Sequence, residues 1–285
     1  MHQNIKGSLF ILLAAATFPA MGALIKLISY ELHPFVIAFF RSFFGFIIIL
    51  PLILTQNSNI LKTKKLFVHL LRGALGVGAM LAGFYALSIL PLASAISIGY
   101  TRVLFLIPLA VIFLSEKVTL PRVGATLIGF LGVIIIVGLD EIELPIFAVC
   151  LSLFSAFLVA GIKLTVKYLS QTESTLTIQM WFGIVSSLGT FVPAVLVWQT
   201  PSTKNIVLLF IIGTLGLIAQ MLTIKGLRIG QATVVMPIDY SRLIFASAYG
   251  FILFGELPTW NTLIGALFII VTCIYINKTE PKKFT

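Results

Sequence analysis

The chain has 285 residues, of which 59% are apolar and 10% are charged. Soluble domains carry about 25% charged residues, so this composition excludes an ordinary globular enzyme, a disordered chain and a disulfide scaffold. The net charge of +10 does not indicate nucleic acid binding, because the basic residues lie mostly between apolar runs and there set orientation in a membrane.

Membrane-spanning helices need about 20 mostly apolar residues each. Ten such runs follow one another along the chain, at residues 8–29, 34–55, 68–90, 93–115, 121–139, 144–167, 175–199, 205–225, 231–255 and 259–277. The longest polar segment, 56–66, is no more than a short loop. The sequence therefore predicts an all-α membrane protein with ten transmembrane helices. The first run follows Lys6, a pattern that is also typical of a secretory signal peptide. We interpret it as the first membrane-spanning helix because it has a counterpart in the second half.

Charged residues between the runs are distributed unevenly over the two sides of the predicted bundle. One set of loops is basic and contains Lys62, Lys64, Lys65, Lys117, Arg122, Lys167, Lys225 and Arg228, with Lys278, Lys282 and Lys283 in the tail. The other set contains Lys204 and the acidic residues Glu31, Asp140, Glu141, Glu143 and Glu256. Because basic loops stay in the cytoplasm, we expect both termini there, as an even number of helices requires.

Two halves of the chain repeat one another at a fixed separation. Residues Tyr100, Arg102 and Glu116 recur 140 positions later as Tyr240, Arg242 and Glu256. Each half, 1–140 and 141–285, holds five of the predicted helices. Because five is odd, the second half enters the membrane in the opposite sense, which gives two inverted five-helix repeats. Inverted repeats are typical of carriers that alternate between two open states.

Several segments resemble a known transporter family. These are Phe39-Phe40-Arg41 and the stretch from Pro237-Ile238-Asp239-Tyr240-Ser241-Arg242 to Phe254-Gly255-Glu256-Leu257-Pro258. With the five-plus-five arrangement, they resemble the EamA branch of the drug/metabolite transporter superfamily over nearly the whole chain. The resemblance implies a multi-pass protein of the bacterial inner membrane with a cavity between helices 1, 3, 4, 6, 8 and 9. Segment 32–44 is also similar to bacterial S-adenosylmethionine uptake proteins, and the general pattern is similar to riboflavin carriers.

Placing a charged side chain at the centre of a membrane-spanning helix costs at least about 2.5 to 3.5 kcal/mol of free energy. Charged residues at this depth are therefore expected to face a cavity or a partner, and they are candidates for substrate binding. Arg102 and Arg242 are related by the repeat, so we expect them on opposite walls of one central space. There they either bind a substrate carboxylate through two hydrogen bonds each or cap carbonyls and bridge helices. Asp239 lies one helical turn before Arg242. It either neutralises this arginine or couples proton movement to transport, or receives a cationic substrate group.

Aromatic and amide side chains complete the predicted binding site. Tyr85, Tyr100 and Tyr240 are candidates for stacking on a planar ring, and Gln179 and Gln220 for hydrogen bonds to a ligand. The alternative for the tyrosines is a role in packing or at the membrane interface.

Five other charged residues are assigned structural or interfacial roles. Arg41 is expected to reach the membrane surface or a lipid phosphate. Lys26 and Lys163 lie near helix C-termini, where a cation stabilises the helix dipole. Glu116 and Glu256 end the fourth and ninth predicted helices and are expected to order the following loops.

No sequence motif for catalysis, a metal or a nucleotide is present, so the chain is interpreted as neither an enzyme nor a cofactor-binding protein. We expect a secondary carrier in the lipid bilayer for a small polar substrate. The first choice is an amino acid derivative or nucleoside-like compound such as S-adenosylmethionine. Alternatives are riboflavin uptake, export of amino acids or amphipathic drugs, and a membrane subunit that transports nothing. A homodimer is compatible with the sequence.

Overall fold

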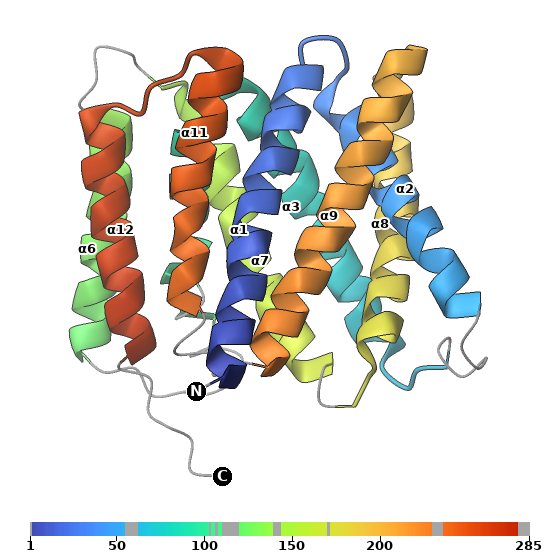
Figure 1. The fold of residues 1–285 in the computed structure, drawn as a ribbon, viewed down its shortest axis with the longest axis horizontal. Coiled ribbons are helices and arrows are strands. Elements are labelled where there is room, and N and C mark those ends of the chain that lie inside the picture. The colour runs from blue at the N-terminus through green and yellow to red at the C-terminus, as the bar shows by residue number, and fades with distance from the viewer. Residues whose placement is uncertain are drawn as a thin grey trace.

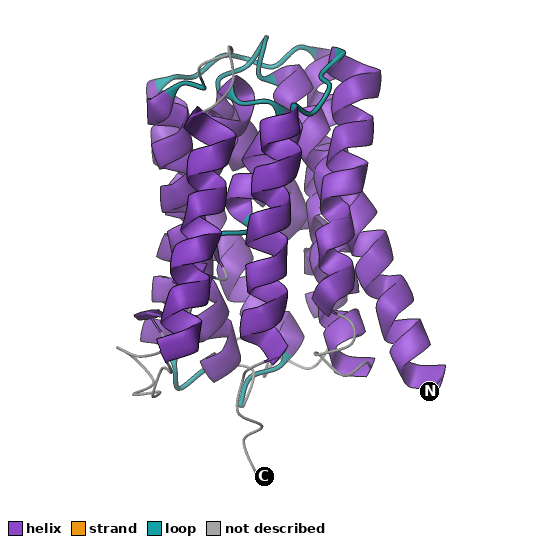
Figure 2. Ribbon diagram, turned by 90° about the vertical axis from the view of Figure 1, so that its left-hand side faces the viewer, coloured by secondary structure: helices purple, strands orange, loops and turns teal. Residues whose placement is uncertain are grey.

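A computed structural model describes residues 2–54, 62–102, 104–105, 108–109, 120–138, 144–169, 172–229 and 236–278. Within these ranges every regular element is a helix, which confirms the all-α prediction (Figures 1 and 2). The elements are α1 (His2–Ile28), α2 (Pro34–Leu54), α3 (Leu66–Ile89), α4 (Leu92–Gly99), α6 (Leu120–Gly138), α7 (Ile146–Leu169), α8 (Thr175–Leu196), α9 (Thr203–Ile229), the 3-10 helix η2 (Met236–Ser241), α11 (Arg242–Phe254) and α12 (Trp260–Lys278).

Apolar side chains cover the outside of the bundle. Six of the described helices, α1, α2, α3, α7, α8 and α9, contain apolar segments of 18 to 24 residues that are long enough to cross a membrane. Large apolar residues on their surface, such as Phe67 and Leu196, are 76% and 81% exposed. Polar residues such as Arg41, Arg72 and Gln179 are buried instead. This reversal of the usual distribution fits a protein whose outer surface contacts lipid.

Helix pairs from the two halves of the chain pack against each other. Helix α1 packs on α9 and α3 packs on α7, while α2 pairs with α8, α4 with α11 and α6 with α12. In Figure 1 the α6 and α12 pair forms one edge of the bundle, and α2 and α8 lie at the other edge. The N-terminal end of α1 and the C-terminal end of α12 lie at the same end of the bundle.

Glycines set two details of this arrangement. A Cβ atom on Gly132 in α6 would lie 2.6 Å from the carbonyl oxygen of Gly265 in α12, so the close approach of these helices requires a residue without a side chain. Gly255 ends α11 with a φ of 68°, a left-handed conformation that glycine adopts without strain. The turn at Gly255 brings Glu256 back toward the bundle.

The repeated Tyr-x-Arg segments both interrupt regular α-helix. Helix α4 ends at Gly99 and is followed by a turn, and α11 is preceded by the six residues of η2. At equivalent positions, the hydroxyl of Thr101 donates to the carbonyl of Ile98 (2.6 Å) and that of Ser241 to Ile238 (2.7 Å). Such hydroxyl bonds compete with regular helical hydrogen bonding. In the described residues, the helix expected at 93–115 is interrupted by a turn after Gly99, and residues 236–241 of the helix expected at 231–255 form a 3-10 helix.

Candidate functional site

A central cavity of about 510 Å³ lies between the two halves of the chain. Its described walls come from α1, α3, α4, α7, α9 and α11, with further residues from α2 and α8. A volume of this size is typical of sites for small organic molecules. Most of the lining is apolar, and several of its polar residues form two groups.

The first polar group is the Arg–Asp–Arg cluster, formed by Arg102, Asp239 and Arg242. Arg102 Nη2 lies 3.1 Å from Asp239 Oδ2, and Arg242 Nη2 lies 2.6 Å from Oδ1. The three side chains are only 14% to 16% exposed. Both arginines line the cavity, but they meet at one carboxylate and do not face each other across an open space. Asp239 is not among the described lining residues, so the cluster presents its two arginines to the cavity and keeps one positive charge that Asp239 does not balance.

Tyr100 links the two repeated motifs. Its hydroxyl donates to the backbone carbonyls of Asp239 and Tyr240, each at 3.2 Å. The rings of Tyr100 and Tyr240 lie 5.2 Å apart, and Tyr100 is 1% exposed. Neither ring lies in the described cavity wall. Tyr100 thus holds the backbone that carries Asp239.

Tyr85 also lies outside the described cavity wall, where its ring contacts His33, Phe35 and Phe147. The aromatic surface of the cavity is instead formed by Phe18, Phe84 and Phe182. Sequence reasoning selected tyrosines because they offer a hydroxyl, whereas these phenylalanines cannot be distinguished by sequence from the many others that face lipid or other helices.

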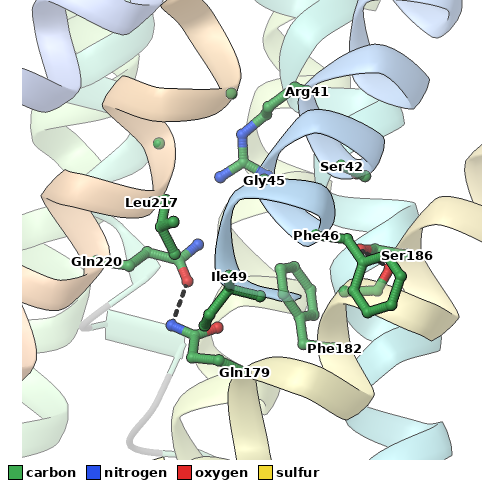
Figure 3. A pocket seen from close by; sticks show the side chains of 13 residues that line it. Arg41, Ser42, Gly45, Phe46, Ile49, Gln179, Phe182, Ser186, Leu217 and Gln220 are labelled. Atoms are coloured by element: carbon green, nitrogen blue, oxygen red, sulfur yellow. Dashed lines mark hydrogen bonds between the residues drawn. The ribbon is translucent and has the colours of Figure 1, made fainter. Parts of the chain in front are cut away.

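Two glutamines form the second polar group with Arg41. Gln179 Nε2 in α8 donates to Gln220 Oε1 in α9 at 2.7 Å, and both residues line the cavity. In Figure 3, Arg41 extends from α2 toward the space beside this amide pair. A small recess of about 30 Å³ is bordered by all three residues.

Arg41 and Arg72 are buried in the cavity wall, 8% and 6% exposed. Arg41 was expected at a membrane surface, but it points inward from α2, and its Nη1 lies 2.8 Å from Met80 Sδ. Arg72 in α3 donates from Nη1 to the carbonyl of Ile178 at 3.2 Å. Sequence reasoning missed Arg72, although an arginine inside an apolar run is itself a signal for a site.

The remaining charged candidates lie at different places. Lys26 forms an ion pair with Glu256 and donates to the carbonyl of Leu90 at 2.8 Å, while Glu256 Oε2 accepts from the N–H of Leu92 at 2.9 Å. These contacts join the end of α1, the start of α4 and the segment after α11. Lys163 lines the cavity from α7. Glu116 and the acidic residues 140, 141 and 143 lie outside the described residues.

Residues 5–138 and 146–278 each match the profile of the EamA-like transporter family. The chain belongs to this family. Proteins with similar sequences include the S-adenosylmethionine uptake transporter of Rickettsia conorii, 30% identical over 99% of this chain and 96% of that protein. The pseudopaline exporter CntI of Pseudomonas aeruginosa is 30% identical over 96% of each chain. The riboflavin transporter of Vibrio cholerae is 28% identical over 99% of this chain and 96% of that protein.

Family membership and the apolar helices agree on the type of protein. This EamA-like protein is a multi-pass membrane transporter and not an enzyme. Its relatives include proteins named for uptake and for export.

Proposed function

We propose that the protein is a secondary carrier that moves an amino acid derivative across the bacterial inner membrane by alternating access, with S-adenosylmethionine as the first candidate. The observation that carries this proposal is the Arg–Asp–Arg cluster, whose two arginines line a cavity of about 510 Å³. The α-amino acid group has a carboxylate and an ammonium group side by side. Arg102 or Arg242, which both line the cavity, offers guanidinium donors to the carboxylate, while Asp239 holds the two arginines together.

The rest of the cavity suits the rest of such a substrate. Phe18, Phe84 and Phe182 provide aromatic surface for a planar base, and the amides of Gln179 and Gln220 provide donors and acceptors for its polar edge. The Arg242 guanidinium lies 4.1 Å from the centre of the Phe18 ring, which places aromatic surface directly beside the charged cluster. The name of the Rickettsia relative supports the same choice of substrate.

The helix contacts support an inverted repeat. If α1, α2, α3, α4 and α6 correspond to α7, α8, α9, α11 and α12, the most extensive contacts between the two halves have counterparts. The contacts of α1 with α9 and α11 correspond to those of α7 with α3 and α4, and α2 with α9 corresponds to α8 with α3. Such reciprocity is expected of two halves, here 1–140 and 141–285, that exchange conformations during transport. We propose ten transmembrane helices in this arrangement, with both termini in the cytoplasm.

Uptake of radiolabelled S-adenosylmethionine into proteoliposomes tests the proposal, with and without a proton gradient. Arg102→Lys and Arg242→Lys keep the charge but lose the two-pronged hydrogen bonding to a carboxylate. We expect each to raise the KM for uptake at least about 10-fold, the equivalent of about 1.4 kcal/mol. Lys204→Arg, at an exposed position, is the matched control and is expected to transport normally.

Riboflavin serves as the competing substrate in the same vesicles. Riboflavin has a planar ring but no carboxylate. Arg102→Lys and Arg242→Lys, which are expected to weaken the binding of a carboxylate, should therefore leave riboflavin transport unchanged. Uptake of riboflavin without uptake of S-adenosylmethionine would refute the proposed substrate. Unchanged uptake of S-adenosylmethionine in both arginine variants would refute the proposed role of the Arg–Asp–Arg cluster.

A further inference from the structure

The central cavity has more positive charge than the Arg–Asp–Arg cluster accounts for. Its described lining includes Arg41, Arg72 and Lys163 in addition to Arg102 and Arg242, whereas no Asp or Glu occurs among these lining residues. Asp239 pairs with Arg102 and Arg242. The cavity therefore favours anions, and part of this preference lies away from the cluster.

Arg41 and Arg72 are buried without an acidic partner among the described residues. The contacts of their side chains are a sulfur atom, a carbonyl and aromatic rings. The Arg41 guanidinium lies 5.9 Å from the centre of the Phe84 ring, and that of Arg72 lies 4.6 Å from the centre of the Phe182 ring. The Nε atom of each arginine has no hydrogen-bond partner in the described part of the chain. Buried charges without partners are costly, so these groups are suited to a ligand that supplies the missing charge.

Amide donors lie beside these arginines. Gln179 follows Ile178, the residue whose carbonyl accepts from Arg72, and it borders the recess that Arg41 enters (Figure 3). Gly216 leaves room for Arg41, because a Cβ atom there would lie 3.1 Å from Arg41 Nε and 3.2 Å from Nη2. Guanidinium groups together with an amide form a donor set that matches the oxygens of a carboxylate or phosphate.

We infer that Arg41 and Arg72 form a second anion-binding site in the central cavity, which takes a carboxylate or a phosphate. The inference rests on the proposed function in that this cavity holds the cargo. A cargo that fills both sites carries an anionic group in addition to its α-amino acid group. S-adenosylmethionine has a single carboxylate, so with this cargo the second site takes a separate anion.

Thermal stabilisation of the purified full-length protein in lipid nanodiscs tests the site, with inorganic phosphate and citrate as probes. Ionic strength is held constant with sodium chloride, so that general salt effects do not change between samples. A ligand at free concentration c that binds only the folded state stabilises it by RT ln(1 + c/Kd), so the melting temperature rises logarithmically once the concentration exceeds Kd. We expect at least one probe to raise the melting temperature in this way. Arg41→Gln and Arg72→Gln should each weaken its apparent affinity by about 10- to 100-fold, the usual effect of removing a hydrogen bond to a charged group.

Three variants control for nonspecific effects. Arg41→Lys and Arg72→Lys keep the charge, so they should retain more affinity than the Gln variants even if the latter fold poorly. Lys204→Gln removes one charge from an exposed position and should bind the probes like the wild type. The inference is overturned if neither probe raises the melting temperature of the wild type at constant ionic strength, or if the affinity is unchanged in both Gln variants.

Uptake of S-adenosylmethionine in the presence of the stabilising probe identifies the source of the anion. Competitive inhibition that is lost in Arg41→Gln and Arg72→Gln assigns the second site to the carboxylate of the cargo. Inhibition or stimulation that changes only the maximal rate assigns the site to a separate ion. Anion binding without any uptake would refute the proposed substrate but support the second site, whereas uptake without anion binding would refute the site alone.

Discussion

Among the residues around the cavity, Asp239 is the one whose substitution should lower the free energy of unfolding of the protein most. It is the acidic partner of both Arg102 and Arg242, at 3.1 and 2.6 Å. Asp239→Asn keeps the shape of the side chain and removes its charge. Two arginines then remain largely buried, at 16% and 14% exposure, without the carboxylate that holds them together.

The size of this effect follows from distance and burial. At an effective dielectric constant of about 20, each ion pair at about 3 Å is worth roughly 5 kcal/mol of Coulomb energy before desolvation is subtracted. Partial exposure screens some of this energy, and breaking a buried pair typically costs about 3 to 5 kcal/mol. We therefore expect Asp239→Asn to lower the free energy of unfolding by about 3 kcal/mol. At about 2 to 4 °C per kcal/mol, the melting temperature falls by about 6 to 12 °C.

Thermal unfolding of the detergent-purified protein measures this change. The double variant Asp239→Asn with Arg102→Gln also removes one of the stranded positive charges, so it should be more stable than Asp239→Asn alone. The reasoning is refuted if Asp239→Asn melts within about 2 °C of the wild type, or if the second substitution lowers stability further by its full single-variant effect.

Three further experiments test other parts of the structure. A double-mutant cycle with Lys26→Ala and Glu256→Ala should give a coupling free energy of at least about 1 kcal/mol, because the two side chains pair directly; additive effects would contradict the pairing. Gly132→Ala should destabilise the protein by about 1 to 3 kcal/mol in thermal unfolding, because its Cβ meets the α12 backbone, whereas Gly124→Ala in the same helix, with open space at its Cβ, should not. Tyr100→Phe should cost about 1 kcal/mol by the same measurement, since it removes the hydroxyl that donates to the carbonyls of Asp239 and Tyr240; a melting temperature equal to that of the wild type would show that these hydrogen bonds contribute nothing.

Local patterns in the sequence predict much of the fold. Apolar runs of about 20 residues predict helices, and the repeat of Tyr100 and Arg102 as Tyr240 and Arg242 predicts that the two motifs are related. The spacing of Asp239 and Arg242 also predicts contact, because residues three apart share one face of a helix. These predictions need only distances along one segment of chain.

Contacts between segments that are far apart in the sequence could not be predicted from such local patterns. Arg102 reaches Asp239 across 137 positions, and Lys26 reaches Glu256 across 230. The direction of a side chain around its helix axis decides whether Arg41 faces lipid or the cavity, and this rotation depends on how α2 packs against α8 and α9. An evenly apolar helix gives no pattern from which the inner face can be identified.

Access of water to the central cavity is the property that transport through it requires most directly. Ala95→Cys places a thiol on the cavity wall, in a protein whose native cysteines are replaced by Cys150→Ser and Cys273→Ser. We predict that small methanethiosulfonate reagents modify this thiol from both sides of the membrane, that S-adenosylmethionine slows the modification, and that the anionic sulfonatoethyl reagent reacts faster than its cationic counterpart. Ala266→Cys in α12, at a position 1% exposed, should stay unmodified. A thiol at position 95 that neither side can reach, or that reacts faster with the cationic reagent, would contradict a positively charged transport cavity.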